Sequence, residues 1–80
     1  MNSFDLALGR VIAEQRGKAG LTQEALAGRA KLHPTYISQL ERGLKSPTVR
    51  ALIAICDGLE LAASEAIRRA ESRSHSRQLK

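Results

Sequence analysis

The sequence predicts an all-α fold in one small domain. Its 80 residues leave no room for a second domain. No stretch alternates polar and apolar residues for long enough to indicate a β-strand. Residues that interrupt helices divide the chain into five short segments with helical periodicity, at positions 17–20, 33–34, 43–47, 58 and 72–76.

The first two segments follow residues that cap helices well. The first is predicted over residues 5–16, with Ser3 as its cap, and its apolar stripe consists of Phe4, Leu8, Val11 and Ile12. The second begins after Thr22, a favourable N-cap residue, and runs to about Ala30.

Proline and glycine bound the next two segments. The third opens at His33 and Pro34, because proline is favoured in the first turn, where no N–H is needed. It ends at Gly43, a good left-handed terminator. The fourth begins after Pro47 with Thr48 as its cap, and its apolar face consists of Val49, Leu52, Ile55, Cys56 and Leu59.

The fifth segment is predicted over residues 63–72 and carries only a thin apolar ridge. Beyond it the chain is polar and rich in serine and arginine. We therefore expect a folded domain over residues 1–71 and a frayed basic tail over residues 72–80.

Leu, Ile, Val and Ala must form the core. Apolar residues make up 42% of the chain, twelve of them are alanine, and the aromatic residues are Phe4 and Tyr36. A domain of this size is marginally stable alone, so self-association is a reasonable expectation.

The composition argues against several classes of protein. Cys56 is the single cysteine, so it forms neither an internal disulfide nor a zinc site by itself. No apolar run approaches the roughly 18 residues that a membrane-spanning helix needs, and the N-terminus does not resemble a secretory signal. No acid–base or metal cluster stands at useful spacing, so we expect that the protein is not an enzyme and binds no cofactor or small-molecule ligand. We expect the protein in a reducing cytoplasm.

Charge favours an anionic partner such as nucleic acid, since the net charge is +5. On a helical wheel of the third segment, Thr35, Ser38 and Gln39 form an uncharged polar edge. Such side chains suit base edges and thymine methyls in a major groove. Around this edge, one carboxylate, Glu41, stands among five cations: Arg29, Lys31, Arg42, Lys45 and Arg50. The alternative is an ordinary amphipathic helix with a solvated face.

Several spaced motifs resemble the Cro/CI-type (XRE) helix-turn-helix family. They are LTQEALA from Leu21, YISQLERG from Tyr36, and SPT from Ser46 followed by the apolar stretch 52–59. The resemblance covers about residues 8–67. It implies a compact five-helix bundle of the lambda-repressor-like type, with a helix-turn-helix unit over residues 23–42. It also implies a regulator, a repressor for instance, that binds operator DNA as a homodimer, with recognition helix 34–42 in the major groove. The length is similar to that of restriction-modification controller proteins and small phage repressors.

The resemblance implies a role for each matching residue. Base-facing positions are matched by Pro34, Thr35, Ser38 and Gln39, of which Pro34 offers only apolar contact. Phosphate-contacting positions are matched by Thr22, Gln23, Tyr36, Arg42, Lys45 and Ser46. Gln23 can also brace the recognition helix, and Tyr36 is equally well explained as a cover for the edge of the core. Arg16 and Glu41 match a structural salt bridge between the first helix and the recognition helix.

Two further residues depart from the family pattern in the turn. Lys31 stands where glycine is common, and a left-handed backbone there costs roughly 1 kcal/mol. His33 stands where a Ser or Thr cap is usual. We expect modest specificity from one monomer, which two half-sites read by a dimer would increase.

The dimer contact is expected from the fifth segment together with the end of the fourth. The candidate interface residues are Ile53, Ala63, Ala66, Ile67 and Ala70, although the same ridge would also serve to pack on its own core. The basic tail has two interpretations, as a contact to flanking DNA or as a solvated end.

Other functions stay open from the residues alone. One is a protein-interaction module on the same bundle, which Lys31 and Pro34 favour. Another is an antitoxin that also represses its own operon. The expected partners are double-stranded DNA of the nucleoid and a second copy of the chain, with RNA polymerase or a cognate toxin as further candidates.

Overall fold

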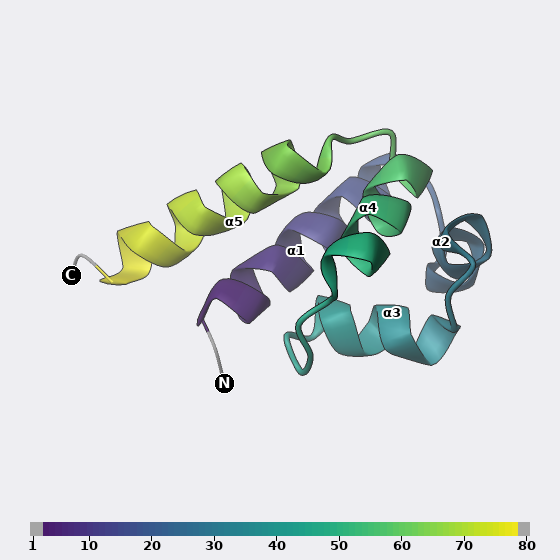
Figure 1. Cartoon of the computed structure of the whole chain (residues 1–80), viewed down its shortest axis with the longest axis horizontal. Helices are drawn as coiled ribbons and strands as arrows, with labels where there is room; N and C mark the ends of the chain where they lie inside the picture. Colours follow the sequence, from purple (N-terminus) through teal and green to yellow (C-terminus); the bar gives the residue numbers. More distant parts are fainter. Residues whose placement is uncertain (1–2, 79–80) are drawn as a thin grey trace.

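The computed structural model describes residues 3–78, and this part of the chain contains five helices (Figure 1). They are α1 (Ser3–Lys18), α2 (Gln23–Ala30), α3 (Pro34–Glu41), α4 (Val49–Gly58) and α5 (Ala63–Gln78). Helices α1 and α5 pack side by side along the longest dimension, and α2, α3 and α4 gather at one end (Figure 1). The predicted five-helix, all-α fold is confirmed.

Local capping signals explain where the middle helices begin. The Thr22 hydroxyl accepts a hydrogen bond from the backbone N–H of Ala25 at 3.0 Å, and the Thr48 hydroxyl accepts one from Ala51 at 3.1 Å. Each contact satisfies a backbone donor that the first turn of a helix leaves without a partner. Pro34 opens α3, and Gly43 follows its end with a φ of 75°.

Within residues 3–78, two non-glycine residues, Lys31 and Glu60, adopt the left-handed conformation. Lys31 ends α2 with a φ of 59° and a ψ of 42°, the left-handed backbone that costs a non-glycine residue roughly 1 kcal/mol. Glu60 has a φ of 56° and follows α4. Gly58, which the sequence predicts to separate the fourth segment from the fifth, is the last residue of α4 and lies close to α2. A Cβ atom there would approach the Leu26 side chain to 3.2 Å, so this glycine permits helix packing.

The core is formed by aliphatic side chains from all five helices. The largest fully buried side chains are Ile12, Leu26, Ile37, Leu40, Ile55 and Cys56. On the predicted apolar face of α4, Leu52 and Leu59 are buried, but Val49 is 73% exposed. Val49 is the first residue of α4 and lies beyond the edge of the core.

Helices α1 and α3 approach each other closely at Gly9. This residue is buried, and a Cβ atom on it would lie 2.3 Å from the Leu40 carbonyl oxygen and 2.6 Å from that of Glu41. No local sequence signal indicated this contact, because Gly9 lies in the middle of a predicted helix. The close approach fixes the C-terminal end of α3 on the N-terminal half of α1.

The expectation of a frayed tail from residue 72 is wrong for its described part, because α5 continues to Gln78. The Ser74 side chain is buried, with its hydroxyl 3.3 Å from that of Ser3, and Arg73 forms an ion pair with Glu14. These contacts hold the end of α5 on α1. Residues 79 and 80 of the predicted tail lie outside the described residues. Within residues 3–78, no helix is long and apolar enough to cross a membrane.

Candidate nucleic-acid interface

The turn between α2 and α3 holds these two helices as a helix-turn-helix unit. The backbone N–H of Lys31 closes α2 onto the carbonyls of Ala27 and Gly28. The His33 Nδ1 atom then accepts a hydrogen bond from the Thr35 N–H at 3.1 Å. The imidazole therefore performs the capping that a serine or threonine hydroxyl commonly provides.

Helix α3 presents the polar edge that the wheel predicted. Ile37 and Leu40 are buried in the core. On the opposite side Thr35 is exposed, and three further residues are partly exposed: Pro34, Ser38 and Gln39. Tyr36 is partly buried and packs against the core, which leaves both of its interpretations open.

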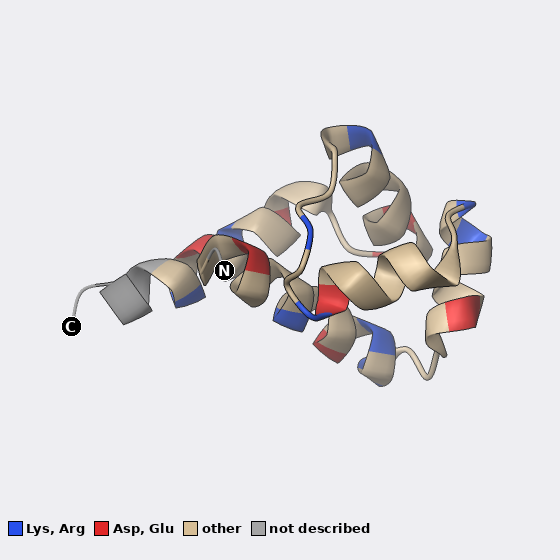
Figure 2. Cartoon of the chain, turned by 90° about the horizontal axis from the view of Figure 1, so that it is seen from below, with Lys and Arg blue, Asp and Glu red and all other residues tan. Residues whose placement is uncertain are grey.

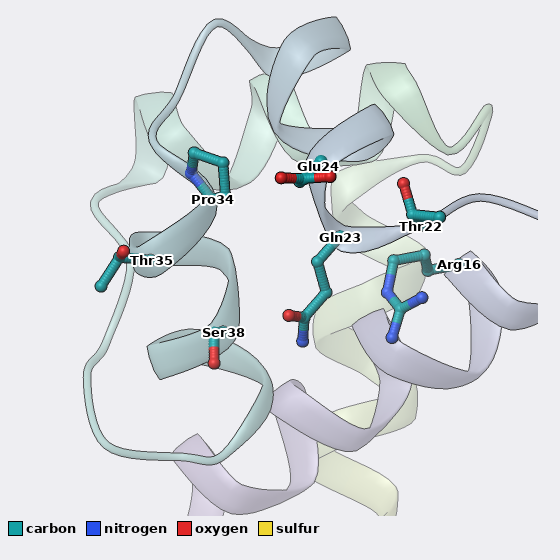
Figure 3. A pocket seen from close by; sticks show the side chains of 7 residues that line it. All are labelled: Arg16, Thr22, Gln23, Glu24, Pro34, Thr35 and Ser38. Carbon is teal, nitrogen blue, oxygen red and sulfur yellow. The ribbon is translucent and has the colours of Figure 1, made fainter.

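An open groove of about 580 Å³ lies between α2 and α3 (Figure 3). It is lined by residues from α1, the first turn of α2 and one side of α3, namely Arg16, Thr22, Gln23, Glu24, Pro34, Thr35 and Ser38. The groove thus brings candidate phosphate contacts and candidate base contacts to one surface. Glu24, which we did not assign to the site, extends its carboxylate across the gap toward Pro34 (Figure 3).

The base of this surface is fixed by an ion pair between Arg16 and Glu41. Arg16 Nε donates to Glu41 Oε2 at 2.6 Å, and Arg16 Nη2 donates to Oε1 at 3.0 Å. The Glu41 side chain is only 6% exposed. Hydrogen bonding to Glu41 raises the pKa of Arg16 above its ordinary value, while burial acts in the opposite direction.

Two further hydrogen bonds extend this pair into a network across three helices. Arg16 Nη1 donates to the Leu21 carbonyl at 2.8 Å, and Gln23 Nε2 donates to Glu41 Oε1 at 2.9 Å. Gln23 therefore braces the recognition helix, as the resemblance implied it can. The network ties α1, the start of α2 and the end of α3 into one rigid frame.

Cations lie on either side of the uncharged stretch of α3 (Figure 2). Arg42 and Lys45 are exposed in the loop after the helix. Arg29 is also exposed, and its Nη1 donates to the Gly58 carbonyl at the end of α4, at 2.9 Å.

The loop after α3 is held to α1 through Ser46. Its hydroxyl donates a hydrogen bond to the Asp5 carboxylate. Asp5 lies in the first turn of α1, where an acid ordinarily stabilises a helix, so its place in the sequence gave no sign of this contact. The proposed phosphate contact of Ser46 must therefore compete with this bond.

The expected dimer residues divide into two groups. Ala66 and Ala70 have no exposed surface, so their assignment to a dimer interface is wrong: they pack on the core of their own chain. Ile53 is 46% exposed, and Ala63 and Ile67 are partly buried. For Ala66 and Ala70, the alternative that the apolar ridge of the fifth segment packs on its own core is therefore correct.

Arginines of α5 are paired with carboxylates of the same chain. Arg68 and Arg69 both donate to Glu65, and these bonds lower the pKa of Glu65 to about 2. Arg73 donates to Glu14 and lowers the pKa of that carboxyl. Three arginines of α5 thus share two carboxylates of the same chain, Glu65 and Glu14.

Cys56 is a core residue. Burial, assisted by the Asp57 carboxylate, raises the pKa of its thiol to about 11. The thiol is protonated near neutral pH and only 1% exposed. The described residues contain no group of three or more His, Cys, Asp or Glu side chains that could hold a metal ion.

Comparison with protein families also identifies a helix-turn-helix domain in this chain. A family model described as a helix-turn-helix domain matches residues 7–70. The chain is also similar to the HTH-type transcriptional regulator y4dJ of Sinorhizobium fredii. The two are 38% identical over 52 residues, which are 65% of this chain and 68% of that protein.

Solved structures with the same fold include two regulators of gene expression. The clp gene regulator ClgR of Corynebacterium glutamicum matches with a TM-score of 0.87 and 26% identity, over 95% of this chain and 81% of that one. The restriction-modification controller protein C.Esp1396I, crystallised as a tetramer with its natural 35-base-pair operator, matches with a TM-score of 0.82 and 29% identity, over 94% and 99%. The expected likeness to controller proteins is confirmed, and the matched proteins are named as regulators rather than enzymes.

Proposed function

We propose that this chain, which belongs to the helix-turn-helix domain family, binds an operator in double-stranded DNA as a homodimer. The chain is a DNA-binding transcriptional regulator of the XRE type. In this proposal α3 lies in the major groove. The observation that carries it is the uncharged, exposed edge of α3, with cations beyond each end of the helix (Figure 2). The protein would act in the cytoplasm, where chromosomal or phage DNA is accessible.

Base recognition is assigned to the exposed edge of α3. Thr35, Ser38 and Gln39 supply hydroxyl and amide groups that reach base edges, and Pro34 supplies apolar contact for a thymine methyl. Their neighbours Ile37 and Leu40 are buried, so the helix can turn no other side to DNA without exposing the core.

Phosphate contacts are assigned to residues around the groove and the following loop, namely Thr22, Gln23, Tyr36, Arg42, Lys45 and Ser46. Thr22 and Gln23 stand at the N-terminus of α2, where the helix dipole favours an anion. Arg42 and Lys45 are exposed cations that attract any duplex. These contacts fix the position of α3 without reading sequence.

Dimerisation is assigned to the exposed apolar surface of α4 and the adjoining part of α5. Ile53 and Val49 lie one turn apart on α4 and are 46% and 73% exposed. On α5, the partly buried residues Ala63 and Ile67 are assigned to the same interface. The proposal is supported by a relative that is a tetramer on its operator. Two copies would place two α3 helices on half-sites roughly 34 Å apart.

Substitutions of Gln39 and Lys45 test the two kinds of DNA contact. Gln39→Ala should relax the preference at one base pair by about 1–3 kcal/mol, with little change in salt dependence. Lys45→Ala should weaken binding to all sequences and lower the log–log salt slope by about 0.9. Arg68→Ala, which removes one charge from α5, is the control and should change neither quantity. Fluorescence titrations of selected and random duplexes at several salt concentrations measure these effects, and equal effects of both variants would contradict the assignment.

Substitution of Ile53 tests the dimer surface. Ile53→Lys should shift sedimentation from dimer toward monomer, because a charge would replace an apolar contact that is buried in the dimer. The dissociation constant of the dimer should rise at least about tenfold, which corresponds to a loss of about 1.4 kcal/mol in the free energy of dimerisation. Ala19→Lys makes the same charge change at an exposed site after α1. Equal association of both variants and wild type would rule out this surface. Duplexes selected from a random pool should contain two symmetric half-sites.

A further inference from the structure

The groove between α2 and α3 contains one acidic side chain, that of Glu24. Glu24 is exposed, and its side chain makes no hydrogen bond or ion pair with any residue of the described range 3–78. It follows Thr22 and Gln23 directly, and its carboxylate reaches toward Pro34 at the start of α3 (Figure 3). The carboxylate therefore lies on the same surface as the proposed phosphate and base contacts.

The charge of Glu24 is not compensated by the other residues that line the groove. Arg16 is the cation among them, and its guanidinium is committed to the Glu41 carboxylate at 2.6 Å and to the Leu21 carbonyl at 2.8 Å. The remaining lining side chains are hydroxyls, an amide and a proline. This part of the surface consequently carries a negative charge where a duplex would approach.

A carboxylate beside phosphates opposes binding, because like charges repel and fewer counterions are released when the complex forms. Position N2 of a helix also favours an acid for stability, since the helix dipole is positive there. Glu24 would thus stabilise α2 in the free protein and lower the affinity of the protein for DNA. That combination identifies it as a residue that sets affinity.

We propose that Glu24 limits the affinity of the helix-turn-helix unit for DNA of any sequence. This inference rests on the proposed function, because it concerns the same surface. With each unit weakened in this way, stable occupancy requires two units on one duplex. The regulator then responds steeply to its own concentration, and isolated monomers are not retained on non-operator DNA.

Replacement of the carboxylate by its neutral isostere tests the proposal. Glu24→Gln should bind both an operator and a random duplex roughly 3- to 10-fold more tightly at low salt, and the gain should shrink as salt screens the repulsion. The log–log salt slope should become steeper by up to about one. Glu71→Gln is the matched control, since it neutralises an exposed glutamate on α5, and it should leave both affinities unchanged.

Other outcomes have distinct meanings. If wild type binds no duplex, the proposed function fails before the role of Glu24 is tested. If wild type binds but Glu24→Gln binds no more tightly, the affinity-limiting role is wrong. If Glu24→Gln weakens binding to one sequence alone, the carboxylate reads a base and the proposal is overturned. Glu24→Lys provides a second test, with a larger gain for both duplexes, and thermal melting of each variant verifies that binding is measured on folded protein.

Discussion

Gly9→Ala is expected to destabilise the protein by at least about 3 kcal/mol, the upper end of the usual cost of overpacking. The new Cβ atom would lie 2.3 and 2.6 Å from two backbone carbonyl oxygens at the end of α3. Backbone atoms cannot move aside as a flexible side chain can, so α1 and α3 must separate. A domain of this size has a free energy of unfolding of only about 4–12 kcal/mol.

Thermal unfolding measures this effect. A loss of about 3 kcal/mol lowers the Tm of a small domain by about 12–24 °C. The control is Gly17→Ala in the same helix, because a Cβ atom there would meet nothing within 4 Å. Replacing a helical glycine by alanine stabilises by up to about 1 kcal/mol, so the control should melt at or above the wild-type temperature. A Gly9→Ala protein that melts within about 4 °C of wild type would contradict the close approach.

Gly9 also illustrates which parts of the fold the sequence could predict. Helix limits that depend on neighbouring residues were predictable, because Thr22 and Thr48 cap the helix that follows them and Gly43 ends one. The need for glycine at position 9 arises from α3, about thirty residues later in the chain. The course of α5 beyond residue 72 likewise depends on contacts with α1.

The candidate site shows the same division between local and distant causes. The polar edge of α3 follows from helical periodicity, so its residues were identifiable from one segment. The burial of Ala66 and Ala70 was not, because small residues suit either a dimer contact or close packing within one chain. Glu24 has the sequence position of an ordinary N-terminal acid, and only the fold shows that it lines the groove together with Pro34.

Arg16→Met is expected to destabilise the protein by about 3 kcal/mol, the usual cost of leaving a buried charge without its partner. The substitution keeps an apolar stem of similar length but removes both hydrogen bonds to Glu41. Glu41, whose side chain is 6% exposed, would keep only the bond from Gln23. Denaturant unfolding measures the loss, and a cost below about 1 kcal/mol would show that the pair behaves as a surface salt bridge.

The double variant Arg16→Met/Glu41→Leu separates the stability of this pair from its role in positioning α3. An apolar pair often replaces a buried ion pair at little cost, so its stability should return to within about 1 kcal/mol of wild type. The bidentate geometry and the brace from Gln23 are nevertheless lost, so the end of α3 is less firmly oriented. We therefore expect a stable protein that binds operator DNA about tenfold more weakly, a loss of 1.4 kcal/mol. Full recovery of both stability and affinity would mean that the ion pair only fills space between α1 and α3.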